Sequence, residues 1–295
     1  MGSSVVAGAT VAAAVGLLLN ALTWGISWWP FRALQSLGLH PLWSTALMYG
    51  LVAVGLLASM PGAWRAFLRP SGLWLLLVSS GLTNVCFNWA VTVGDVVRVV
   101  LLFYLMPAWV VLLAWALLDE RPAPRSLGRV ALAMVGVAVV LKTDGQAWPV
   151  PHSLADWLAL AGGFCFGLTN VLLRRLRGTS TASTMLAMFA GGATMAALVA
   201  WWGGWSGVVP PVPALAWDWV LGIVALGVVF MVGNLGLQYG AARFSAGTTS
   251  IVMLSEVVFA SVSAVALGAG VLSVQVVLGA TLILLAALLS VRSSG

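Results

Sequence analysis

Ten apolar runs recur along this chain, and each is about as long as a helix needs to cross a lipid bilayer. A hydrocarbon core of about 30 Å takes about 20 helical residues, because each residue adds about 1.5 Å. The breaks between the runs are rich in Pro and Gly and too short for a soluble domain. The runs lie at roughly 10–31, 41–60, 72–93, 97–118, 126–142, 155–174, 182–202, 216–238, 246–268 and 272–291. The sequence therefore predicts an all-α membrane protein with ten transmembrane helices in the lipid bilayer.

The composition agrees with a membrane protein and excludes several other classes. Hydrophobic residues make up 62% of the chain and charged residues only 7%, against roughly 25% charged residues in a soluble domain. The net charge of +6 comes from scattered basic residues, which form no run that could follow a nucleic-acid backbone. Cys86 and Cys165 lie inside apolar runs, where cysteine usually packs as a small hydrophobe. We therefore expect no nucleic-acid partner, disulfide framework, metal site or cofactor.

The basic residues are unevenly divided between the two sets of connecting loops. Cytoplasmic loops retain Lys and Arg, so the asymmetry orients the chain. Arg32, Arg98 and Lys142 fall on one side. The others lie in or beside the even-numbered loops and the C-terminus: Arg65, Arg69, Arg121, Arg125, Arg129, Arg174, Arg175, Arg177, Arg243 and Arg292. Both termini are therefore predicted to be cytoplasmic, as an even number of spans requires.

The ends of the runs carry two further signals. No Lys or Arg precedes Arg32, so we expect no secretory signal with a positive n-region, and the first span should be kept. Tryptophans cluster near the run ends, where interfacial anchoring is their usual role. They include Trp28, Trp29, Trp43, Trp64, Trp148, Trp157, Trp201, Trp202, Trp217 and Trp219.

Two pairs of amide side chains echo one another inside the third and eighth runs. Asn84 and Asn88 are four residues apart, as are Asn234 and Gln238. On a helix each pair shares one face, and such faces are tolerated in a membrane where they look into a protein interior or a water-filled cavity. The alternative is that the amides join helices, at about 0.6 kcal/mol each. Amides of a cavity could bind both the ammonium and the carboxylate of an amino acid.

The echo belongs to a longer internal repeat. At the same offset of about 150 residues Met106 matches Glu256, whereas in the first spans Gly25 matches Gly167 at an offset of about 142. We expect two units, residues 1–145 and 152–292, with five spans each. Because five is odd, the second unit enters the membrane from the opposite side, and the two are inverted copies. Inverted repeats place a binding site at their interface and permit alternating access.

Three mid-span residues are candidates for moving parts or polar contacts. Glu256 is the acidic residue deep in a span, where an unpaired carboxylate costs about 2.5–3.5 kcal/mol. It could contact a substrate ammonium, carry a proton, or stay protonated and bond to a neighbouring helix. Pro107 removes a backbone hydrogen bond and is a candidate hinge, although a static kink fits equally. Tyr104, one turn earlier, could present its hydroxyl to the cavity.

Other side chains inside the runs allow a functional or a structural interpretation. An aromatic substrate needs rings to stack on, although most buried aromatic residues only pack. Asn20 and Asn170 could add to a polar lining or join helices, and Arg98 with Asp95 is expected to form a surface pair. The aromatic candidates are Trp24 first, then Phe87, Trp89, Trp109 and Phe166.

The chain resembles an EamA-type member of the drug/metabolite transporter superfamily. The resemblance rests on Trp24-Gly25, on Leu105-Met106-Pro107 followed by Glu120, and on Ser255-Glu256-Val257. The sequence departs from the family pattern at Val257, where proline is usual, and at Ala269-Gly270, where an acidic residue is usual. The resemblance implies a bacterial inner-membrane exporter, here expected as a monomer, that moves aromatic and other amino acids and some cationic compounds. The alternative within this class is a multidrug or metabolite exporter.

A membrane-embedded enzyme is the rival class. It would need a nucleophile with a base, a metal set or paired carboxylates. The two histidines, His40 and His152, lie in loops beside prolines, and Glu256 has no second mid-span carboxylate. The sequence lacks the Walker-type glycines that would indicate an ATPase. It also lacks the rings of like charge that would indicate a channel. We therefore expect a secondary transporter of a small molecule and not an enzyme.

Overall fold

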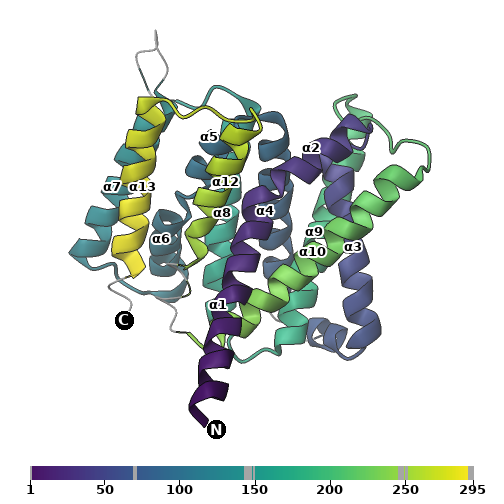
Figure 1. Ribbon diagram of the computed structural model, residues 1–295, viewed down its shortest axis with the longest axis horizontal. Helices are drawn as coiled ribbons and strands as arrows, with labels where there is room; N and C mark the ends of the chain where they lie inside the picture. Colours follow the sequence, from purple (N-terminus) through teal and green to yellow (C-terminus); the bar gives the residue numbers. More distant parts are fainter. Residues whose placement is uncertain are drawn as a thin grey trace.

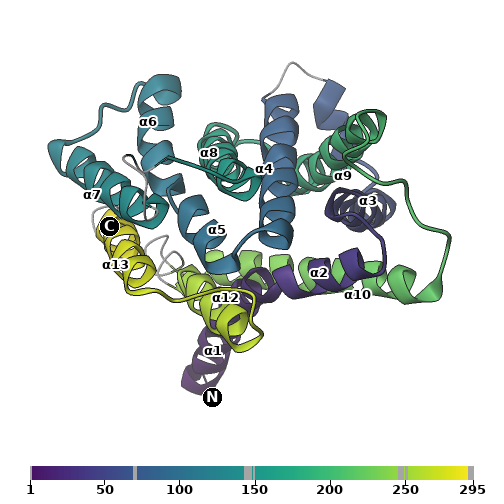
Figure 2. The ribbon, with the colours of Figure 1, turned by 90° about the horizontal axis from the view of Figure 1, so that it is seen from above.

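The computed structural model describes residues 2–68, 72–142, 148, 150–244, 249 and 252–291, and within them the chain is all-helical. Figure 1 shows the arrangement, and Figure 2 shows it from above. The helices are α1 (Gly2–Ile26), α2 (Trp28–Ser36), α3 (Pro41–Ser59), η1 (Ala63–Leu68), α4 (Leu73–Val93), α5 (Val96–Phe103), α6 (Met106–Leu118), α7 (Pro124–Leu141), α8 (Leu154–Arg175), α9 (Thr181–Trp205), α10 (Trp217–Ala241), α12 (Ser255–Ala266) and α13 (Val274–Val291).

In the part of the chain that the structure describes, eight helical segments are long and apolar enough to cross a membrane, and two shorter apolar helices accompany them. The chain is therefore a multi-pass membrane protein. The two short helices are α12 and the Val274–Ala286 part of α13, which fall in the ninth and tenth predicted spans. Of the ninth, 246–268, residues 246–248, 250 and 251 lie outside the described part, as do the basic residues Arg69 and Arg292. The start of α1 and the end of α13 lie at the same face of the molecule (Figure 1), while their placement in the cytoplasm stays a prediction.

The first span is longer than predicted and is interrupted at Ser27. The candidate span runs from Val11 to Ser36, and α1 stops at Ile26 before α2 begins. Pro30 explains the break, because it has no N–H to donate to the carbonyl of Ile26. The Ser27 hydroxyl donates to the Trp24 carbonyl at 2.8 Å.

The fourth span is interrupted in the same way. Tyr104 and Leu105 form a turn between α5 and α6, and Pro107 is the second residue of α6. The ring of Pro107 lacks the N–H that would bond to the carbonyl of Phe103. In the second half a turn at Leu254 precedes α12, although Val257 stands where the family usually has proline. Proline is therefore not required for a break at this place.

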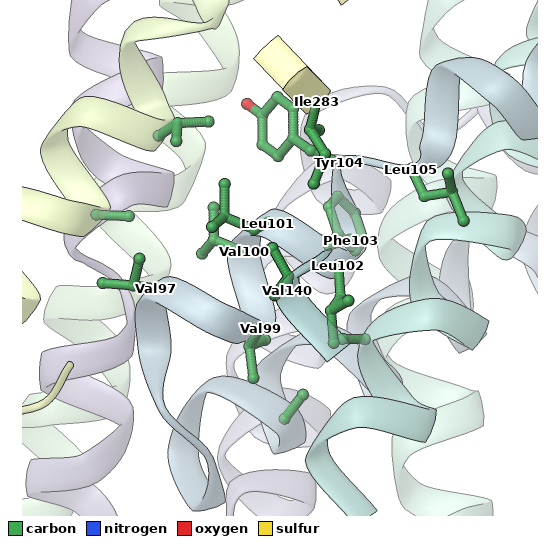
Figure 3. Packing of buried hydrophobic residues seen from close by; sticks show 14 of the residues in the cluster. Val97, Val99, Val100, Leu101, Leu102, Phe103, Tyr104, Leu105, Val140 and Ile283 are labelled. Carbon is green, nitrogen blue, oxygen red and sulfur yellow. The ribbon is translucent and has the colours of Figure 1, made fainter. Parts of the chain in front are cut away.

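The α5 helix is buried on all sides and forms the centre of the largest hydrophobic cluster. Figure 3 shows its side chains between those of neighbouring helices, with Val140 of α7 and Ile283 of α13 against them. A helix that is apolar all round belongs in a protein interior. Its buried side chains are Val96, Val97, Val99, Val100, Leu101, Leu102 and Phe103.

Polar contacts at the face opposite to the termini differ from two predictions. Arg98 does not form a surface pair with Asp95, because its guanidinium bonds to both carboxylate oxygens of Asp156 at 2.7 and 3.0 Å. Asp95 instead caps α5, accepting from the Arg98 backbone N–H at 2.8 Å. Trp28 is not an interfacial anchor: it is 3% exposed, and its indole N–H donates to Ser263 at 3.0 Å.

The start of α3 shows how a loop histidine serves the fold. Pro41 opens the helix, where its missing N–H costs nothing. Nδ1 of His40 accepts from the Leu42 backbone N–H at 3.3 Å. Burial lowers the pKa of His40, which favours the neutral ring that this acceptor role requires.

Candidate functional site

A cavity near the middle of the molecule is lined by helices of both halves. About 60 Å³ of it is open to the centres of water-sized molecules, enough for about four waters at roughly 10–15 Å³ each. The lining comes from α1, α3 and α4 in the first half and from α8, α9 and α10 in the second: Trp24, Tyr49, Ser80, Thr83, Asn84, Phe166, Thr169, Met188, Phe189, Phe230 and Asn234.

The two asparagines on the wall are held in different ways. Asn84 accepts a hydrogen bond from the Tyr49 hydroxyl and donates from Nδ2 to the Ser80 carbonyl at 2.8 Å. Asn234 accepts from Nε2 of Gln238 at 2.8 Å. Within the described residues Nδ2 of Asn234 donates no hydrogen bond. The Asn234 amide therefore offers its donor to whatever enters the cavity.

The other two amides of the echo do not line the cavity. Asn88 is fully buried, and its Nδ2 donates to the Thr45 hydroxyl at 3.0 Å. Gln238 supports Asn234 from one turn away and also contacts the sulfur of Met185 at 2.9 Å. Each pair thus contributes one amide to the wall and one to the packing or support behind it.

Aromatic rings make up much of the remaining wall. The Trp24 ring meets Phe230 edge-on, with centroids 4.8 Å apart, and Phe87 at 5.9 Å. Trp24 and Phe230 line the cavity, whereas Phe87 does not. Edge-to-face contacts of this kind are favourable, and in each of them the edge of one ring covers a face of the other.

The remaining predicted residues lie elsewhere. Asn170 donates from Nδ2 to the Phe166 carbonyl of its own helix at 2.8 Å and does not line the cavity. The Tyr104 hydroxyl donates to Oε2 of Glu256 at 3.2 Å, also away from the cavity wall. Tyr104 and Pro107 border a second, smaller cavity of about 10 Å³.

Sequence reasoning missed several wall residues. Tyr49 is one of three tyrosines and sits in mid-span, a signal that could have been read. Thr83 and Ser80 surround Asn84 at helical spacing and extend its polar face. Thr169 and Phe230 gave no signal, because apolar and hydroxyl residues are common on every face of these helices. Among the described residues, no three His, Cys, Asp or Glu side chains gather as metal ligands would.

Comparison with known proteins identifies the class of this site. The sequence model of the EamA-like transporter family matches residues 11–142 and again residues 153–292. The chain belongs to the EamA-like transporter family. It is therefore a membrane transporter of small molecules, and the cavity between its halves is the natural candidate for the substrate site. A search among curated proteins found no match.

Solved structures agree on the fold. A crystal structure of a protein 16% identical in sequence aligns over 96% of this chain and 95% of its own, with a TM-score of 0.57. At this level of identity the likeness concerns the fold alone.

Proposed function

We propose that this family member is a secondary transporter that exports amino acids, aromatic and other neutral ones, by alternating access through the central cavity. The observation that carries the proposal is the wall itself, where Asn84 and Asn234 from opposite halves meet the Trp24 and Phe230 rings. Amide donors and acceptors suit the ammonium and carboxylate of a zwitterion. Apolar walls with rings accept many side chains at low affinity.

Many transporters with alternating access are built from two inverted halves, and one pair of contacts supports such a relation here. A Cβ on Gly25 would lie 2.8 Å from the Glu256 carbonyl oxygen, so α1 and α12 touch through their backbones. A Cβ on Gly167 would lie 3.4 Å from the Met106 carbonyl oxygen, so α8 approaches α6 at the matching place. Gly25 corresponds to Gly167 and Met106 to Glu256 in the sequence repeat. Each half therefore meets the other through the same reciprocal contact, as inverted repeats would.

The cellular setting follows from the same proposal. We infer ten spans with both termini in the cytoplasm, a bacterial inner membrane, and a monomer whose two halves enclose the path. The tryptophan content and span layout resemble those of the bacterial aromatic amino acid exporter YddG. This resemblance is our reason for proposing aromatic substrates.

The test is exchange of labelled phenylalanine in proteoliposomes that contain the full-length protein. Asn234→Ala and Trp24→Ala should each lower exchange about tenfold or more, since one lost contact of about 1.4 kcal/mol costs a factor of ten. Trp202→Ala is the matched control, because this ring is 72% exposed on the outside of α9. Exchange by the wild type of another metabolite class, with none of any amino acid, would overturn the assigned substrate. Equal loss in the Trp202 variant would overturn the assigned site.

A further inference from the structure

Glu256 is an ionisable group that the substrate cavity does not use. The six other acidic residues of the chain lie at or beyond the ends of the apolar runs. Glu256 alone lies deep within one, and it does not line the central cavity. A carboxyl group is costly in this position, so it marks a function by default.

The partner of Glu256 is itself buried. Tyr104 is 4% exposed and donates its hydroxyl proton to Oε2 of Glu256 at 3.2 Å. Tyr104 lies in the turn between α5 and α6, and Glu256 lies in the first turn of α12. Both members of the pair therefore sit where a membrane helix is interrupted and its backbone is free to adjust.

The surroundings of Glu256 act in opposite directions on its two protonation states. Hydrocarbon favours the neutral acid, whereas the start of a helix and a donating hydroxyl favour the carboxylate. A group held between such opposed influences can take up and release a proton without a large change in its environment.

Other charged groups nearby are accounted for. On α1, residues 17–26 include no titratable side chain. On α5, Arg98 is paired with Asp156 at the opposite end of the helix from Tyr104. Arg129 of α7 borders the small cavity that Tyr104 also borders. Within the described residues, Tyr104 is the titratable side chain that hydrogen-bonds to Glu256.

The pair also has a mechanical connection to the substrate cavity. The backbone of Gly25 touches α12, because a Cβ there would lie 2.8 Å from the Glu256 carbonyl oxygen and 2.7 Å from Cβ of Phe259. Trp24, the next residue, forms part of the cavity wall. A shift at the start of α12 would therefore reach the wall through α1.

We propose that Glu256 and Tyr104 form the proton-coupling site of this transporter. A proton from the outer solution forms an O–H bond on the Glu256 carboxylate, and that bond breaks on the other side as the proton leaves. Each cycle moves one proton inward while one amino acid moves outward, since one carboxylate carries the charge. The inference rests on the proposed transport function and adds its driving force.

The experiment measures accumulation and exchange separately in proteoliposomes. With an interior about one pH unit more acidic than the medium and the membrane potential held at zero, departing protons should drive about tenfold accumulation of phenylalanine by the wild type. E256Q should lose this accumulation but keep phenylalanine exchange at equal pH within about threefold, because exchange needs no net charge movement. E120Q is the matched control, because Glu120 lies exposed at a helix end beside Arg174 and should keep both activities.

A second variant separates coupling from folding. Tyr104→Phe removes the hydrogen bond that Tyr104 donates to Glu256 without changing the ring, so the pH midpoint of accumulation should move upward. A wild type that exchanges phenylalanine but ignores the pH gradient overturns the coupling site alone. A wild type without any amino acid exchange overturns the proposed function instead. Accumulation that survives in E256Q shows that Glu256 carries no proton, and a lost exchange in this variant shows that it belongs to the transport path itself.

Discussion

At the scale of single residues, Asn88 and Asn234 differ in what surrounds them. Asn88 is fully buried, its Nδ2 bonds to Thr45, and its Oδ1 has no partner among the described residues. Asn234 faces the cavity. Two amides that look alike in the sequence thus have different surroundings.

Asn88→Ala should lower the melting temperature slightly and leave phenylalanine exchange within about twofold. The variant loses one hydrogen bond between helices, worth about 0.6 kcal/mol in a membrane. Differential scanning fluorimetry of the detergent-solubilised protein, beside the exchange assay, measures both. Asn234→Ala is the reciprocal control: this variant should lose phenylalanine exchange and keep the melting temperature of the wild type. A large loss of exchange in the Asn88 variant would place this amide in the path.

At this scale the sequence shows which residues inside the apolar runs are polar. It does not show which way each side chain points. Asn84 and Asn234 could be predicted, because a lone amide in an apolar run needs a polar neighbour or a cavity. The roles of Asn88 and Gln238 could not, because a shared helix face is wide enough to contain both the cavity wall and the next helix. Phe230 carries no polar signal at all, and only the folded chain brings it against Trp24.

At the scale of helices, Asp95 joins the two halves at the face opposite to the termini. Its Oδ1 accepts from the Arg98 N–H at 2.8 Å and its Oδ2 from the Val271 N–H at 2.9 Å. The adjacent Val96 N–H donates to the Ala269 carbonyl at 3.2 Å. We call these contacts the Asp95 latch, since they tie the turn before α5 to the turn after α12.

Asp95→Ala should open this face more often. A hydrogen bond to a charged group is worth about 1.5–3 kcal/mol, which corresponds to about a tenfold or larger rise in the open population. The measurement is maleimide labelling of a cysteine placed at Ala269, in a chain whose own Cys86 and Cys165 are replaced by alanine. Asp218→Ala, in the first turn of α10, is the control and should leave the labelling rate unchanged. An unchanged rate in the Asp95 variant would show that the latch does not limit opening.

The positions of proline residues predict where helices end more reliably than hydropathy does. Pro107 was expected to disturb the fourth span, and the chain does turn at Tyr104 and Leu105. Pro30 ends α1 earlier than the apolar run ends, because hydropathy does not record a missing N–H. The turn at Leu254 has no proline signal, so a sequence pattern alone could not place it.

At the scale of the whole molecule, the distribution of basic residues predicts how the chain is oriented in the membrane. Ten of the thirteen basic residues are expected on the side of both termini, including residues outside the described part. Membership of the transporter family could be anticipated from the resemblance carried by short motifs such as Leu105-Met106-Pro107. The apolar helices could be anticipated because the bilayer permits few architectures. The packing of α1 on α12 and of α8 on α6 required the fold.

A reporter fused after Gly295 should show a cytoplasmic C-terminus. Alkaline phosphatase at this point should be inactive, and green fluorescent protein should fluoresce, because Lys and Arg are retained inside. Phosphatase inserted after Gly207, in the turn between α9 and α10, should be active. The opposite pattern at both positions would invert the predicted orientation.

The edge-on meeting of Trp24 and Phe230 has a consequence for affinity. If the substrate is an aromatic amino acid, the contact between Trp24 and Phe230 in the empty transporter takes the place of a contact with the substrate ring. A protein ring already occupies the position that the substrate ring would take. Entry then replaces one ring contact by another of about 0.5–1.5 kcal/mol, with little net gain. Such a transporter binds its substrate with low affinity and releases it quickly. Its transport rate rises mainly when the substrate concentration is high.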